Sequence, residues 1–187
     1  EEIDSYISPA TGKPIQPNAA PGDTKFEDLN GDGVISDDNE DRTMIGKPNP
    51  DWMVGLTVAA DWNGFDLSAF FQGSFGADVF DALRRYELAA VNYTSDALER
   101  WTGPGTSNSM PRIVLGDTPK NFRPSTLLVH DASFLRLRNL QVGYTLPAQL
   151  TRKAYIQRLR FYASFDNLLT ITGYKGMDPE IGSTMGI

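Results

Sequence analysis

The sequence has 187 residues but no cysteine and only one histidine, His130. Disulfides therefore cannot stabilise the fold, and the single histidine argues against a catalytic triad or a histidine-rich metal site. The net charge of −7 argues against a nucleic-acid groove. No apolar run approaches the roughly 20 residues of a membrane-spanning helix. We expect neither catalytic residues nor a nucleic-acid partner.

Alternating apolar and polar residues dominate the middle of the chain. From Trp52 to Trp62 the even positions are large and apolar, while the odd positions are mostly small or polar, which indicates a strand. The dipeptide Asn63-Gly64 is a strong hairpin signal, and a second alternating strand follows to Phe75. Residues 1–50 are rich in Pro, Gly, Asn and Asp and predict loops.

Two further strands are predicted near the end of the chain, over 134–146 and from Leu159 onward. The apolar parity of the first one switches near Arg138, which indicates either a β-bulge there or an upper part of the strand that faces other surroundings than the lower part. Residues 76–130 form a long excursion between strands. We expect helices over 79–91 and over 95–101, the second with Ser95 or Asp96 as its N-cap.

The strands fit two kinds of sheet. Their roughly 10–13 residues and terminal aromatic side chains suit a transmembrane β-barrel, in which the apolar face meets lipid. The alternation of long loops with short turns also suits a barrel. A soluble β-sandwich would use the same period of two, with its apolar face packed on a second sheet. The residue pattern leaves both possibilities open.

The segment "DLNGDGVI" resembles the first eight residues of a calcium loop. Asp28, Asn30 and Asp32 stand at ligand positions 1, 3 and 5, Gly33 allows the turn, and Val34 offers a backbone carbonyl. Position 12 is Asn39 instead of a carboxylate, so a nearby acidic residue would have to close the loop. The alternative is an acidic turn that binds no metal.

Longer motifs resemble one family. The stretches "DLNGDGVISDDNEDRTMIGKPNPDW", "GFDLSAFFQG", "SFLRLRNLQVGYTLP" and "LRFYASFDNLLTITGYKGMDPEIG" are similar, in order, to the C-terminal barrel segment of SusC/RagA TonB-linked transporters. The resemblance implies an all-β fold: antiparallel strands forming part of a large transmembrane barrel, with long extracellular loops, one of them partly helical. Four strands with open edges cannot lie in lipid alone, so we expect the chain to be part of a larger protein.

The resemblance also implies an organisation and partners. Residues 1–50 would be an extracellular loop region with the calcium-like loop, and residues 51–187 the barrel strands, with the helical insertion at 76–130. The parent would import glycans or peptides across a bacterial outer membrane, acting with a SusD-like lipoprotein and with TonB through a plug. The family form favours Asp41 as the closing ligand of a structural Ca²⁺, with Glu40 as the rival.

A soluble, calcium-dependent glycan-binding module of a secreted protein is the alternative function. The two interpretations differ in the surroundings of the apolar side chains. A barrel predicts that Trp52, Leu56, Phe71 and Phe161 touch few protein atoms, whereas a sandwich predicts that they are densely packed.

Overall fold

The computed structural model describes residues 2–36, 40–82, 86 and 92–180. Two compact units make up the chain. The loop unit comprises residues 1–45 and 81–129, and the sheet unit comprises residues 46–80 and 130–187.

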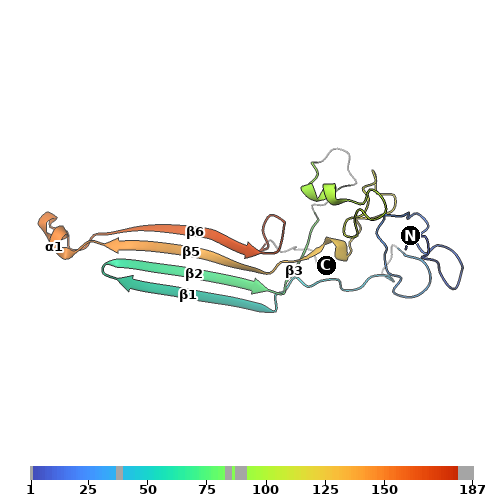
Figure 1. Ribbon diagram of the computed structural model, residues 1–187. Helices are drawn as coiled ribbons and strands as arrows, with labels where there is room; N and C mark the ends of the chain where they lie inside the picture. The colour runs from blue at the N-terminus through green and yellow to red at the C-terminus, as the bar shows by residue number, and fades with distance from the viewer. Residues whose placement is uncertain (1, 37–39, 83–85, 87–91, 181–187) are drawn as a thin grey trace. The chain divides into compact units, whose positions relative to one another are not determined.

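The sheet unit contains a four-stranded antiparallel sheet of long strands (Figure 1). Its strands are β1 (Trp52–Trp62), β2 (Phe65–Phe75), β5 (Phe134–Thr145) and β6 (Arg160–Thr172), in the order β1-β2-β5-β6. All four confirm strands predicted from the sequence. The β1–β2 connection has positive φ at both Asn63 (49°) and Gly64 (89°), as a two-residue type I′ hairpin requires.

The remaining elements are short. Strands β3 (Asp78–Phe80) and β4 (Val129–Asp131) form a separate two-stranded sheet. The helical turns are η1 (Ser95–Glu99), η2 (Thr126–Leu128), α1 (Ala148–Thr151) and η3 (Arg152–Ala154). In the described ranges, every helix is too short to cross a membrane.

The two predicted helices of the excursion need correction. Val79 and Phe80 belong to strand β3, and most of the rest of the first predicted helix lies outside the described residues. The second helix is a single 3₁₀ turn, and Thr94 is its N-cap in place of Ser95 or Asp96. No side chain forms a capping hydrogen bond at this turn. The Ser95 and Asp96 side chains, which the sequence suggested as caps, therefore do not stabilise its N-terminus.

The strand register sorts the side chains into two faces. Paired residues lie on the same face of a sheet, and one face is apolar across all four strands. The predicted bulge is confirmed, because the register on both sides of β5 shifts at Arg138. The apolar face comprises Trp52, Val54, Leu56, Val58, Ala60 and Trp62 of β1, Phe65, Leu67, Ala69, Phe71, Gly73 and Phe75 of β2, Leu135, Leu137, Leu140, Val142 and Tyr144 of β5, and Phe161, Ala163, Phe165, Leu169 and Ile171 of β6.

This apolar face is not packed as a core. Trp52 is 72% exposed, Leu56 59% and Phe161 61%, while Phe71 is half-buried. Among the described residues of the four-stranded sheet, the buried apolar side chains are those of Ala69 and Phe134. A soluble sandwich would need dense contacts on this face, so the sheet lacks the packing that the alternative predicts.

Candidate functional site

The polar face of the sheet carries an arginine cluster next to the bulge. The side chain of Arg136 is only 7% exposed. Its Nε donates to Thr170 Oγ1 at 2.9 Å, and its two terminal nitrogens donate to Asp178 at 2.6 Å and Glu180 at 2.8 Å. A buried guanidinium is tolerated only when its donors are paired, and here each of its three nitrogens has an acceptor.

Arg138, at the bulge, extends the same cluster. It donates to Gln72 Oε1 at 2.7 Å, to Asn167 Oδ1 at 3.2 Å and to Glu180. Asn167 has a positive φ of 52°, so the extra residues of β6 at the bulge turn this amide toward Arg138. Arg136 and Arg138 thus both donate to the carboxylate of Glu180.

The segment after β6 is held against the sheet by these contacts. The Glu180 backbone N–H donates to Asp178 Oδ1 at 2.9 Å. This bond, together with the Arg136 guanidinium, holds the pKa of the Asp178 carboxyl below its ordinary value. The acidic partners of these arginines lie more than 40 residues away, and the sequence pattern did not reveal them.

A bidentate ion pair occupies the polar face near the turn end of the sheet. Arg160 Nε donates to Asp66 Oδ1 at 3.0 Å, and an Nη of the same guanidinium donates to Asp66 Oδ2. Gly143 pairs with Asp66 of β2 and with Tyr162 of β6, two residues from Arg160, and a Cβ at this position would clash with both members of the ion pair. The missing side chain of Gly143 therefore makes room for the pair.

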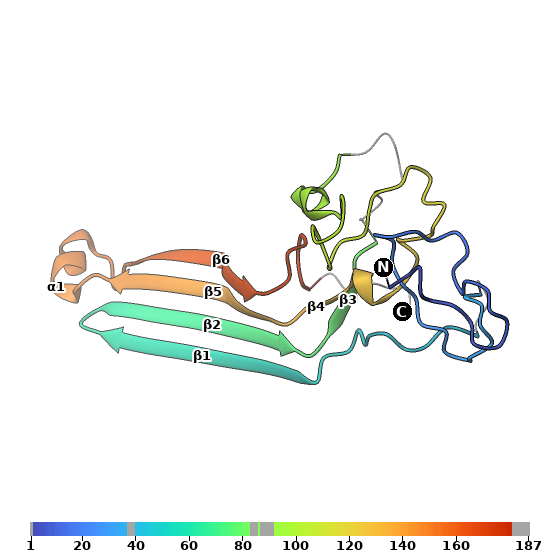
Figure 2. The same cartoon turned by 45° about the vertical axis from the view of Figure 1, so that its right-hand side comes forward.

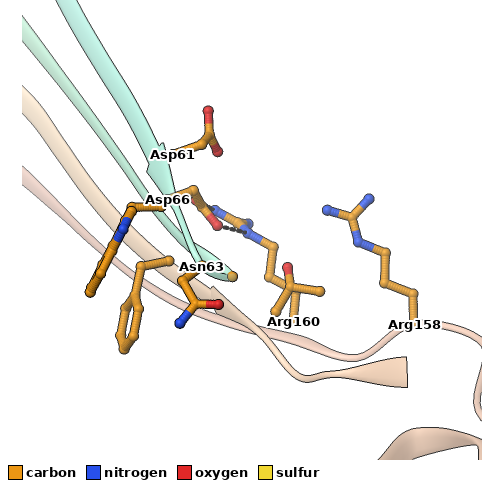
Figure 3. A pocket seen from close by; sticks show the side chains of 9 residues that line it. Asp61, Asn63, Asp66, Arg158 and Arg160 are labelled. Carbon is orange, nitrogen blue, oxygen red and sulfur yellow. Dashed lines mark hydrogen bonds and ion pairs between the residues drawn. The ribbon is translucent and has the colours of Figure 1, made fainter. Parts of the chain in front are cut away.

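This pair borders a small polar hollow at the end of the sheet (Figure 3). Asp61 and Asn63 of the β1–β2 hairpin lie on one side of it, and Arg158, just before β6, lies on the other. Arg158 thus stands outside the strand, whereas Arg136, Arg138 and Arg160 lie within strands.

The predicted calcium-binding residues form a tight turn in the loop unit. Asp28 accepts hydrogen bonds from the backbone N–H groups of Gly31 and Gly33, both at 2.7 Å. Gly31 and Gly33 have positive φ values of 78° and 84°, which suit glycine. Asp32 Oδ1 accepts from the Val34 backbone N–H at 2.8 Å, so this carboxylate also folds back on its own loop.

Asp41 closes this turn. Its two carboxylate oxygens accept from the backbone N–H groups of Leu29 at 3.1 Å and Ser36 at 2.8 Å. The Ser36 bond is the main reason that the pKa of Asp41 lies below its ordinary value. Glu40 instead accepts from the Asn30 amide at 3.2 Å. Asp41 therefore bridges the backbone of Leu29 and Ser36 near the two ends of the loop.

The donor set suits calcium in its chemistry, with three carboxylates, one amide oxygen and one backbone carbonyl. The Asn30 amide nitrogen lies between Asp32 and Glu40, donating to them at 3.1 and 3.2 Å. In the described part of the chain, no three Asp, Glu, His or Cys side chains converge on a common metal position. Calcium at this loop stays a prediction.

A buried polar group that the sequence did not reveal holds the loop unit together. The Asp23 side chain is fully buried and accepts from Arg112 Nε at 2.6 Å and Nη2 at 2.8 Å. Asn121 donates to Asp23 at 2.9 Å and accepts from the Thr24 backbone N–H at 2.8 Å. Residues about 90 positions apart are joined here.

Burial and hydrogen bonding shift the pKa of the Asp23 carboxyl group in opposite directions. Burial alone raises the pKa of Asp23. Hydrogen bonds from Arg112 and Asn121, and one from the Ala20 backbone N–H at 2.8 Å, outweigh burial, so the pKa lies below its ordinary value. The carboxylate is therefore charged in the folded protein at neutral pH.

Comparison with known proteins gives a consistent set of relatives. No protein-family model matches the chain. TonB-dependent receptor P3 of Formosa agariphila is 37% identical over 161 residues, covering 86% of this chain and 16% of that protein. TonB-dependent receptor SusC of Bacteroides thetaiotaomicron is 30% identical over 168 residues, covering 89% and 16%.

Solved structures agree with these relatives. The RagAB peptide importer in its closed-closed state matches with a TM-score of 0.64 and 31% identity, covering 81% of this chain and 17% of that chain. The RagAB peptide transporter matches with a TM-score of 0.60 and 34% identity, covering 74% and 15%. The chain spans about one-sixth of the length of the relatives it matches.

Proposed function

Because this chain belongs to the SusC/RagA family of TonB-dependent receptors, we propose that it forms four adjacent strands of an outer-membrane import barrel. The apolar face of the sheet faces lipid, and the polar face lines the interior. The rest of the parent protein supplies the other strands, which cover the open edges of β1 and β6, because unpaired backbone groups are not tolerated in hydrocarbon.

An aromatic row across the sheet is the observation that carries this proposal. Trp62 pairs with Phe65, Phe65 with Tyr144, and Tyr144 with Phe161. The row thus places one aromatic residue of every strand near the same end of the apolar face. Trp62 is 76% exposed, so the row has no protein core to fill. Membrane barrels place such girdles where the hydrocarbon meets the headgroups.

The length of β1 agrees with a membrane span. The ten residue steps from Trp52 to Trp62 cover about 33 Å along the strand. At a tilt of about 40°, this corresponds to about 25 Å along the membrane normal, which is the height of the apolar band of such barrels. Trp52 and Trp62 then lie at opposite interfaces.

The parent acts as an importer without enzymatic activity, energised by TonB and assisted by a SusD-like lipoprotein at its outer mouth. The names of the relatives, TonB-dependent receptors and a peptide importer, support this assignment and do not favour the soluble glycan-binding module. A glycan or a peptide is the cargo. In this arrangement the loop unit lies outside the membrane, where its acidic turn takes up a structural Ca²⁺ through Asp28, Asn30, Asp32, Val34 and Asp41.

Flotation of the full-length parent tests the proposal. The parent, refolded with phosphatidylcholine vesicles, should float with them in a density gradient and stay with them after a carbonate wash. A parent that remains in the dense, lipid-free fractions without detergent would contradict the barrel assignment.

A further inference from the structure

The β5–β6 turn is basic in an otherwise acidic chain. Between Leu146 and Leu159 the sequence has Arg152, Lys153 and Arg158 and neither Asp nor Glu, whereas the whole chain carries a net charge of −7. Within the described residues, Arg152 and Lys153 are exposed and form no ion pair. Arg158 instead borders the hollow next to Asp66. Two cations of the turn are thus available to an outside partner.

Apolar side chains accompany these cations. Tyr155 is 99% exposed and Leu150 57%. Tyr155 has the left-handed φ of 58°, which is uncommon for a residue with a large side chain. Its backbone N–H donates to Arg152 O at 3.1 Å, and the Ile156 N–H donates to Thr151 O at 3.1 Å. Backbone hydrogen bonds thus hold the turn that presents the aromatic ring and the two cations.

The register places the turn close to the aromatic row. The Leu146 N–H donates to Leu159 O at 2.9 Å, so the pairing of β5 and β6 continues for two residues beyond Tyr144 and Phe161. Two residues of strand measure about 7 Å. The β1–β2 hairpin lies at the same end of the sheet as α1 (Figure 2). In the proposed barrel, the turn therefore begins at the boundary between the hydrocarbon core and the headgroup region of the bilayer.

Resting on the proposed barrel, the structure leads us to infer that the β5–β6 turn is a docking surface for anionic phospholipid headgroups. Arg152 and Lys153 contact the lipid phosphates, and Tyr155 and Leu150 lie at the boundary with the acyl chains. Aromatic rings with one polar end favour this depth, and basic side chains beside it attract anionic lipid. In the barrel, the lipids bound here belong to the membrane leaflet on the side of the short turns.

Native mass spectrometry of the full-length parent tests the inference. The parent is released from detergent after incubation with increasing phosphatidylglycerol or phosphatidylcholine, and bound lipids are counted. Arg152→Ala/Lys153→Ala should weaken one class of phosphatidylglycerol adduct about 30-fold, since each basic residue near an anionic surface contributes roughly five-fold. Phosphatidylcholine adducts should not change. Arg152→Lys/Lys153→Arg should keep the wild-type adducts.

The matched control is Lys13→Ala/Lys175→Ala, which removes the same charge from two exposed lysines elsewhere in the chain. It should leave phosphatidylglycerol binding unchanged. Equal loss in the control and in the turn variant, or no loss in either, would overturn the inference. The barrel assignment is judged separately by flotation with pure phosphatidylcholine vesicles. If the parent floats and the turn variant keeps all its adducts, only the inference fails; if the parent does not float, both fail.

Discussion

An arginine on the apolar face of β1 should be far more damaging than one on the polar face beside it. Leu56 and Thr57 are neighbours, and both are exposed in this four-stranded segment. The register directs Leu56 to the apolar face, opposite Phe71, and Thr57 to the polar face, opposite Phe70. Arginine substitutions at these two positions therefore test which face of the sheet meets lipid, with both side chains at nearly the same depth.

The expected magnitude follows from that depth. Thr57 is the midpoint between Trp52 and Trp62, and Leu56 is one residue, about 3 Å, from it. Near the midplane of a barrel, an arginine on the lipid face costs about 2–4 kcal/mol. Leu56→Arg should thus lower the free energy of unfolding of the parent by about 2–4 kcal/mol. Thr57→Arg, with its side chain in a polar interior, should lower it by less than about 1 kcal/mol.

Urea titration of the parent refolded in vesicles measures both changes, with tryptophan fluorescence as the readout. Wild type and both variants should have the same slope against urea, so that the midpoints report stability. Equal losses in both variants, or a larger loss for Thr57→Arg, would refute the assignment of faces.

Three further predictions concern the loops. Calcium should raise the melting temperature of the wild-type loop unit but not that of Asp28→Ala, measured by calorimetry of the parent. If calcium changes neither melting temperature, the acidic turn binds no metal. Asp23→Ala should destabilise the loop unit by about 1–3 kcal/mol, because it leaves the Arg112 donors unpaired. Since the folded pKa of Asp23 is depressed, its contribution is complete above the unfolded value of about 3.9 and is lost as the pH falls through the folded pKa. Hydrogen exchange of residues 16–26 against pH checks both effects, and protection that is unchanged in Asp23→Ala would contradict them. Arg136→Ala should increase exchange in residues 173–180 while β2 stays protected, because it frees Asp178 from the sheet and leaves Arg138 as the remaining arginine bound to Glu180; unaltered exchange there would show that Arg136 does not hold this segment.

The sequence was most informative where local chemistry decides the structure. Period-two alternation located all four long strands, Asn63-Gly64 located the hairpin, and a switch of parity located the bulge at Arg138. Each of these signals depends on neighbouring residues. The three-residue strands β3 and β4 are too short to show a period, and tertiary hydrogen bonds define them instead.

Long-range polar contacts could not be read from the sequence. Asp23 and Arg112 are 89 residues apart, and Arg136 lies 42 residues from Asp178. Charge pairing over such separations depends on how the loops fold, which alternation does not encode. For the acidic turn, the sequence predicted Asp28, Asn30 and Asp32 in the order of calcium ligands, whereas the structure shows that the Asp41 carboxylate bridges Leu29 and Ser36 near the two ends of the loop.

Alternate labelling along β1 tests the central claim most directly. Single cysteines are introduced at each position from 52 to 62 of a parent with no other reactive thiol, and each variant is exposed in vesicles to a lipid-soluble and to a water-soluble maleimide. The account predicts that even positions react with the lipid-soluble reagent and odd positions with the water-soluble one. Labelling without this alternation, or with the two parities reversed, would contradict it.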